Sequence, residues 1–134
     1  MSLPRADMSY PNSPAAKEPR DRALAALYQA EQRQNSDLPS LTGKAGRYVR
    51  GVLAHRLDLD RRIEEVSEGW PLHRMPVVDR TILRLGLYEL LHEPTPTAVI
   101  LNEAVELAKR YSTSESGKFV NGVLATLSRS ARPE

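Results

Sequence analysis

The side chains that most often carry out chemistry in proteins are scarce in this sequence and poorly spaced for a metal site. It has no cysteine, which excludes disulfides, thiolate ligands and cysteine nucleophiles. The three histidines, His55, His73 and His92, stand 18 and 19 residues apart. None belongs to an HxxxH or HxxH pair, which would place two imidazoles on one face of a helix. We therefore expect no metal and no cofactor.

Other arrangements that could support catalysis are incomplete. Asp58 and Asp60 could be a carboxylate pair for acid–base chemistry, and so could Glu64 and Glu65, but acidic residues at the start and on the solvated face of a helix explain them more simply. The Gly-Lys pair at 43–44 lacks the other residues of a phosphate loop. No serine lies in a nucleophile-elbow sequence. The sequence favours a binding protein over an enzyme.

Cationic and aromatic side chains near both ends of the predicted domain are suited to RNA. The N-terminal cations precede or begin a predicted helix, where they could meet phosphates from several directions. The aromatic rings could stack on unpaired bases, and the lysine of the last helix lies beside free backbone N–H groups. From spacing alone, solubilising charge and core packing remain alternatives. The candidates for RNA contact are Lys17, Arg20, Arg22, Tyr28, Lys118 and Phe119.

Length and composition are those of one soluble globular domain. The chain has 134 residues, 40% of them hydrophobic and 27% charged. The formal net charge is +2, and residues 1–50 hold eight Lys or Arg against five Asp or Glu. A phosphate-binding surface should therefore involve the N-terminal part. No stretch is long and apolar enough for a signal peptide or a membrane helix, so we expect a cytoplasmic protein.

Hydrophobic periodicity predicts helices through the first half of the chain. Residues 1–19 contain four prolines and predict a flexible N-terminal arm ahead of a helical domain over 20–134. Apolar residues at helical spacing predict a helix over 20–34, and residues 35–43 are a polar break. A second stripe, with members Ala45, Val49, Val52, Leu53 and Leu57, and a third, with Leu59, Ile63, Val66 and Trp70, predict two further helices.

The second half predicts three more helices and a buried centre. Residues 76–92 are apolar around most of the helix circumference, which is typical of a central helix. Gly86 within it indicates close approach of a neighbouring helix. Residues 97–111 form a two-sided amphipathic helix, and a capping box from Ser112 to Glu115 begins a last one, to about Arg129. The fold class is all-α with six or seven helices.

Three separated segments of the second half resemble the NusB family in order and spacing. They are WPLHRMPVVDRTILRLGLYELLH, NEAVELAKRY and KFVNGVL. Weaker matches are the ALY of the first helix, at 26–28, and the Gly-Val pair at 51–52. The resemblance covers most of residues 20–129. It implies an all-helical protein of two packed small helical bundles.

The resemblance also implies a function in transcription antitermination. NusB proteins pair with NusE, a ribosomal small-subunit protein, and the pair binds boxA-type single-stranded RNA. They help RNA polymerase read through terminators, notably in rRNA operons. On this chain the boxA contacts would be the basic start of the first helix, Tyr28 and the pair at 118–119. NusE would meet the face of the central helix, and the residues implied there are Asp79, Arg80, Arg84, Tyr88 and Glu89.

One departure from the family pattern keeps two alternatives open. The sequence before Arg20 has fewer arginines than is usual in the family, which predicts weaker RNA binding with a shallower salt dependence. The chain could therefore be a helical interaction protein with a weakened RNA surface. The RNA-targeting module of an rRNA cytosine methyltransferase is the other alternative, but that enzyme needs a cofactor-binding sheet and a cysteine, and the sequence to Glu134 shows neither. Homodimerisation stays open.

Overall fold

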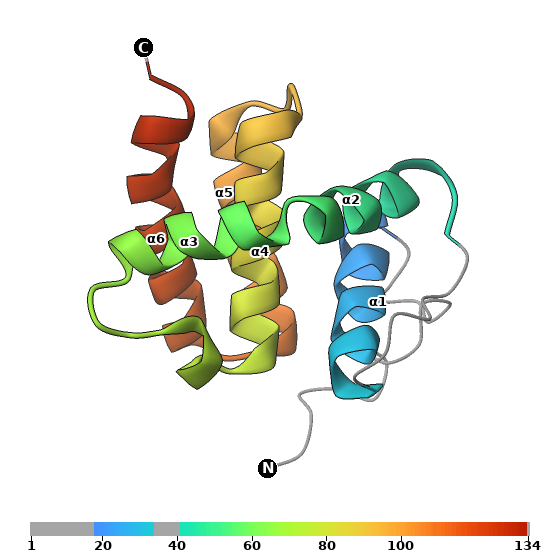
Figure 1. Cartoon of the computed structure of the whole chain (residues 1–134), viewed down its shortest axis with the longest axis horizontal. Coiled ribbons are helices and arrows are strands. Elements are labelled where there is room, and N and C mark those ends of the chain that lie inside the picture. Colours follow the sequence, from blue (N-terminus) through green and yellow to red (C-terminus); the bar gives the residue numbers. More distant parts are fainter. Residues whose placement is uncertain (1–17, 34–40, 134) are drawn as a thin grey trace.

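The computed structural model describes residues 18–33 and 41–133, and its regular structure there is entirely helical. Within these residues there are six α-helices and one short 3₁₀ helix, and no strand. The predicted all-α class is confirmed, and Figure 1 shows the arrangement. The elements are α1 (Pro19–Arg33), α2 (Gly43–Ala54), α3 (Arg56–Val66), η3 (Leu72–Arg74), α4 (Val77–His92), α5 (Thr97–Tyr111) and α6 (Ser114–Ala131).

The helices form two groups, and α4 of one group packs against α1 and α2 of the other. In Figure 1, α4, α5 and α6 stand side by side and antiparallel to their neighbours, while α1 and α2 pack together on the other side. Helix α3 continues from α2 and crosses in front of α4, where it packs against both α4 and α6. None of the described helices is both long enough and apolar enough to cross a bilayer.

Helix α4 is the centre of the core, as its sequence predicts. Every residue from 81 to 90 is buried, and Ile82, Leu83 and Leu87 have no exposed surface. Gly86 permits close contact with a neighbouring helix. A Cβ atom there would lie 2.7 Å from Cδ1 of Leu124 on α6, so a side chain at this position would require Leu124 to shift. The expectation of close helix approach at Gly86 is confirmed.

The predicted stripe of the second helix is wrong at its C-terminal end. Leu53 still lies within α2 but is 41% exposed. His55 then separates α2 from α3 with φ −109° and ψ 15°, and Leu57, which follows this break, is 87% exposed. Helix α3 also ends earlier than its stripe indicates, at Val66 rather than near Trp70.

Polar side chains bind the backbone at two helix ends, the start of α6 and the end of α4. Helix α6 is capped by Thr113, whose side chain accepts a hydrogen bond from the Ser116 N–H at 2.9 Å, so the predicted capping box at Ser112 is wrong by one residue. Arg132 folds back onto the end of α4. Its guanidinium donates to the carbonyl oxygens of Leu90, at 2.8 Å, and Glu93, at 2.6 Å, which would otherwise lack partners at the helix end.

Candidate nucleic-acid interface

A largely apolar groove of about 880 Å³ lies where α1, the segment before α4 and the start of α6 meet. Helix α1 contributes one aromatic residue, and the C-terminal end of α5 closes one side. The groove is lined by Tyr28, Trp70, Arg74, Pro76, Val77, Val78, Asp79, Tyr111, Ser112, Thr113, Glu115, Ser116 and Phe119. This size and lining suit a flat ring system, such as a nucleobase.

Aromatic residues from four separate segments line this groove. The rings of Trp70 and Phe119 are in contact, with centroids 4.8 Å apart and planes tilted by 60°. Trp70 is 39% exposed and Phe119 is half-buried, so both present ring surface to solvent. Tyr28 and Tyr111 are buried, and burial raises the pKa of the Tyr28 hydroxyl. The groove therefore offers two partly exposed rings beside two buried ones.

Local backbone geometry presents Trp70 to the groove. After α3 ends, Glu68 and Gly69 adopt left-handed conformations with φ of 45° and 81°. Two hydrogen bonds between Ser67 and Trp70 close the turn. The Trp70 N–H donates to the Ser67 carbonyl, and the Ser67 hydroxyl donates to the Trp70 carbonyl, each at 3.1 Å. Glycine at 69 allows the positive φ without strain. The chain thus changes direction just before Trp70, and the indole ring of Trp70 contacts Phe119.

Polar groups lie at the floor and rim of the groove. The Ser116 hydroxyl donates to Oδ2 of Asp79 at 2.8 Å, while the buried Oδ1 of Asp79 has no partner among the described residues. At the rim, Lys118 forms an exposed ion pair with Glu115 at 3.6 Å, and both side chains are about four-fifths exposed. Such a pair contributes little to stability and leaves the lysine available to a phosphate.

The comparisons with known proteins agree with this architecture. The NusB family profile matches residues 17–129, which is most of the chain. The chain belongs to the NusB family. The transcription antitermination protein NusB of Acidothermus cellulolyticus is 48% identical over 126 residues, which is 85% of this chain and 87% of that protein. The corresponding protein of Saccharopolyspora erythraea is 43% identical over 127 residues, covering 84% and 86%.

Solved NusB structures share the fold. NusB of T. maritima superposes with a TM-score of 0.73 at 40% identity, covering 80% of this chain and 85% of that one. A second similar structure is a crystal structure of the antitermination factors NusB and NusE in complex with double-stranded RNA. A chain of that complex superposes with a TM-score of 0.72 at 26% identity, covering 84% and 94%. The resemblance to NusB and the fold predicted from it are confirmed.

The structure brings together some of the residues predicted to bind RNA and separates others. Tyr28 and Phe119 line one groove, and Lys118 adjoins Phe119 on the outer face of α6. Lys17 lies outside the described residues. Arg22 is half-buried on the first turn of α1, and no comparison assigns it a role. These RNA contacts remain predictions.

Arg20 has an internal partner that sequence reasoning did not anticipate. Its guanidinium donates two hydrogen bonds to the Glu89 carboxylate, at 2.7 and 2.8 Å, and its side chain is 15% exposed. The Tyr48 hydroxyl donates to the same carboxylate at 3.0 Å. Beside this cluster, the buried Asp21 accepts from Arg110 at 2.9 Å and from the Tyr111 hydroxyl at 3.1 Å. The start of α1 is therefore fastened to α2, α4 and α5.

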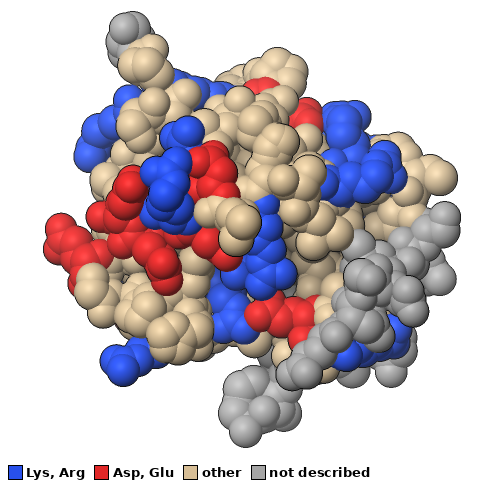
Figure 2. Space-filling view, in the orientation of Figure 1, with Lys and Arg blue, Asp and Glu red and all other residues tan. Residues whose placement is uncertain are grey.

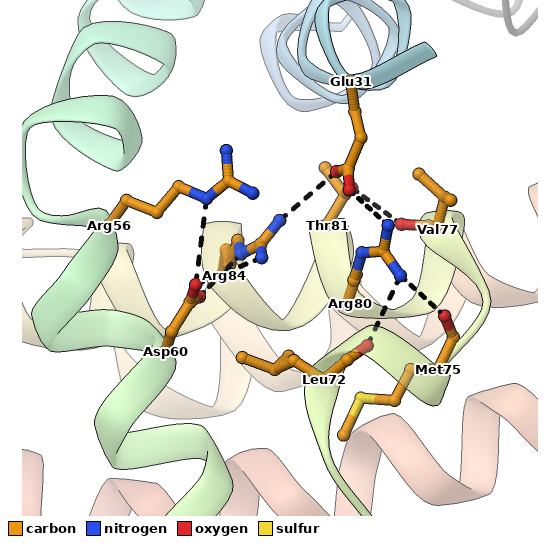
Figure 3. Close-up of polar contacts among 9 residues, drawn as sticks. All are labelled: Glu31, Arg56, Asp60, Leu72, Met75, Val77, Arg80, Thr81 and Arg84. Carbon is orange, nitrogen blue, oxygen red and sulfur yellow. Dashed lines mark hydrogen bonds and ion pairs between the residues drawn. The ribbon is translucent and has the colours of Figure 1, made fainter. Parts of the chain in front are cut away.

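Most of the predicted NusE contacts on α4 are buried. Arg84, Tyr88 and Glu89 are at most 6% exposed, and Asp79 lies at the groove floor. Figure 3 shows how Arg84 is held: its guanidinium donates to Asp60 of α3, at 2.7 Å, and to Glu31 of α1, at 3.4 Å. The NusE contacts remain predictions.

Arg80 belongs to the same internal cluster, one turn before Arg84. Its side chain is 14% exposed, pairs with Glu31 and donates to the carbonyl of Met75 at 3.0 Å. Burial alone would raise the pKa of Glu31, but the hydrogen bond and charge of Arg80, together with the charge of Arg84, lower the pKa overall. This cluster joins α1, α3 and α4.

Two features of the structure, one of them in the groove, escaped sequence reasoning. Trp70 was assigned to the apolar face of a helix, whereas it follows the helix and lines the groove with Arg74. The Gly-Trp-Pro run at 69–71 was a usable signal, because glycine and proline mark a turn that can display an aromatic ring. His55 and His92, far apart in sequence, also meet with ring centroids 4.1 Å apart. No third potential metal ligand joins them among the described residues.

Proposed function

We propose that this chain is a transcription antitermination factor that binds boxA-type single-stranded RNA together with NusE and promotes read-through by RNA polymerase, notably in rRNA operons. The groove with the rings of Tyr28, Trp70 and Phe119 carries the proposal. Relatives named transcription antitermination protein NusB support it, as does the similar NusB in a complex with NusE and RNA. The role is binding, not catalysis.

The chemistry of the groove fits an unpaired RNA strand better than a duplex. Bases in a duplex are stacked on one another, whereas a single strand can turn its bases out onto aromatic side chains. Trp70 and Phe119 offer such surfaces without demanding one base type, because every base has a π-face. Lys118 and Arg74 lie at or near the rim, where a phosphate would pass. The phosphates then position the strand while the rings hold its bases.

The test removes the rings while keeping an apolar side chain. Trp70→Leu and Phe119→Leu should each weaken binding of a boxA-containing RNA by about 1–3 kcal/mol, the usual contribution of one stacked base. Val99→Ala is the matched control, because Val99 is an exposed apolar residue on α5 outside the groove. Binding is measured with and without NusE, and circular dichroism confirms that each variant is folded.

The wild-type chain itself provides the decisive comparison. If the protein with NusE binds boxA-containing RNA no more tightly than a scrambled RNA, the proposed function is wrong. Retained NusE binding without that preference would instead favour a helical interaction protein with a weakened RNA surface. One observation favours this second candidate: the Arg20 guanidinium is held by Glu89 rather than free to meet a phosphate.

A further inference from the structure

A cluster of cations on α2 lies outside the groove and has no role in the proposed function so far. Lys44, Arg47 and Arg50 are all exposed, and they occur at intervals of three residues, about one per helical turn. Helix α2 contains no acidic residue. Its opposite face, with Ala45, Tyr48, Val49 and Val52, is buried against the rest of the protein. Figure 2 shows the blue cationic surface at the upper right, over α2.

The three charged groups gather over the first half of the helix rather than spreading along it. The Lys44 ammonium lies 5.5 Å from the centroid of the Tyr48 ring, and the Arg47 guanidinium lies 5.7 Å from the same ring. Arg50 folds back toward the helix start: its Nη1 donates to the Leu41 carbonyl at 3.4 Å and lies above Gly46. Lys44 and Arg47 thus share the ring of Tyr48, while Arg50 places its charge nearer the helix start.

Little negative charge opposes this cluster. Arg47 makes a two-pronged ion pair with Glu93, with both contacts at 3.0 Å. Among the described residues, Lys44 and Arg50 form no ion pair with a carboxylate. Two of the three cations are therefore available, which contrasts with α3, where Arg61 and Arg62 are paired with carboxylates of their own helix. The acidic surface of α3 appears in red at the left of Figure 2.

The cluster is also continuous with the start of α1. The cationic groups of Lys44 and Arg47 lie over the Tyr48 ring. The Tyr48 hydroxyl donates to Glu89, and the same carboxylate accepts from Arg20. A strand that reaches the basic start of α1 would therefore meet α2 next. Because Arg20 is neutralised by Glu89, Lys44 and Arg50 are better placed than Arg20 to contact phosphates.

We propose that Lys44 and Arg50 of α2 form a second RNA contact, which holds the phosphate backbone of a strand whose bases occupy the aromatic groove. This inference rests on the proposed function, and it extends the RNA footprint to the opposite group of helices. The ligand chemistry is that of successive phosphates, because the cluster offers several cations and no ring surface for a base. The contact therefore adds affinity without sequence preference.

The experiment compares a short RNA that fills only the groove with one extended by about 10 nucleotides on each side, a length chosen to exceed a single binding site. The variant is Lys44→Gln/Arg50→Gln in the full chain. The control, Arg61→Gln/Arg129→Gln, removes the same charge from α3 and α6. Affinities are measured over a range of salt concentrations, with and without NusE.

The expected result is specific to the long RNA. The α2 variant should lower the slope of log affinity against log salt by about 1.4, since each phosphate contact on a single strand contributes about 0.7. At about 0.1 M salt its affinity should fall on the order of tenfold. Binding of the short RNA should not change, and the control should leave the slope for the long RNA within error of the wild type.

Other outcomes overturn the proposal. If the salt slope for the long RNA is unchanged, α2 does not contact the RNA. If the control variant loses as much affinity as the α2 variant, the effect is due to net charge and not to α2. Loss of NusE binding with intact RNA binding would make α2 a protein contact instead. Failure of the proposed function is separate: it would show as no effect of Trp70→Leu or Phe119→Leu on the short RNA.

Discussion

At the scale of single residues, the same side-chain type serves opposite purposes in this protein. Arg20 and Lys44 are both cations near the start of a helix, and the sequence gives no reason to treat them differently. In the structure Arg20 neutralises the buried Glu89, whereas Lys44 stays exposed. A carboxylate without water must be paired, so Glu89 determines the role of Arg20. The partner lies 69 positions away along the chain, which is why local sequence could not reveal it.

Arg20→Ala should therefore destabilise the fold rather than change RNA affinity alone. Removing one partner of a buried pair leaves the other charge without compensation, and we expect a loss of about 3 kcal/mol in the free energy of unfolding, measured in urea. The double variant Arg20→Ala/Glu89→Gln should recover part of it, since a neutral amide no longer needs a cation. Equal unfolding free energies for wild type and Arg20→Ala would show that the pair is not stabilising.

At the scale of helices, glycines allow neighbouring helices to approach closely. The sequence shows where these glycines are, but it does not show which residue each of them contacts. Gly86 was expected to admit another helix, and the neighbour is Leu124 of α6. Gly51 was only a family match, yet it admits the ring of Tyr88. The bounds of α1, α4 and α5 follow closely from periodicity and breakers, because those signals are local. The break at His55 had no such signal.

Gly51→Ala should weaken the contact between α2 and α4. A Cβ atom at Gly51 would lie 2.2 Å from Cε1 of Tyr88, and a buried ring cannot move aside without disturbing its hydrogen bond to Glu93. Overpacking of this kind costs about 1–3 kcal/mol, which exceeds the gain of up to about 1 kcal/mol from replacing glycine in a helix. Thermal unfolding of the variant measures the balance.

Gly122→Ala provides the matched control for that measurement. It also lies within a helix, α6, but nothing approaches within 4 Å of its Cβ position. Only the helix propensity then changes, so Gly122→Ala should raise the melting temperature while Gly51→Ala lowers it. Shifts of the same sign in both variants would contradict the close approach of α2 to Tyr88.

At the scale of the whole molecule, helix α1 is fastened to the C-terminal helices at both of its ends. Arg20 and Asp21 bind Glu89 and Arg110 at the start, and Glu31 binds two arginines of α4 near the end. Between them the helix buries residues 23–28. The sequence predicts a buried face with Leu24, Leu27 and Tyr28, but it predicts none of these ion pairs, because each joins helices distant in sequence. The aromatic groove depends on the same assembly, since Tyr28 lies between the two fastenings.

This arrangement predicts an acid-sensitive junction between the two groups of helices. The folded-state pKa of Glu31 lies below its ordinary value of 4.5, so its pairing with Arg80 and Arg84 stabilises the fold above about pH 4.5 and is lost as the pH falls through the folded-state value. Glu31→Gln should cost about 2 kcal/mol at pH 7, as expected for charged hydrogen bonds in a partly buried cluster.

Because protonated Glu31 and glutamine are both neutral, the difference between the two proteins should shrink as the pH falls below 4.5. Urea unfolding at pH 7 and at several values below 4.5 would measure it, and Glu65→Gln is the control, since Glu65 makes only an exposed ion pair within α3. A difference that stays constant with pH would mean that Glu31 acts through packing rather than charge. The end of α1 would then be held to α4 by apolar contact, while the ion pairs of Arg20 and Asp21 would still hold its start.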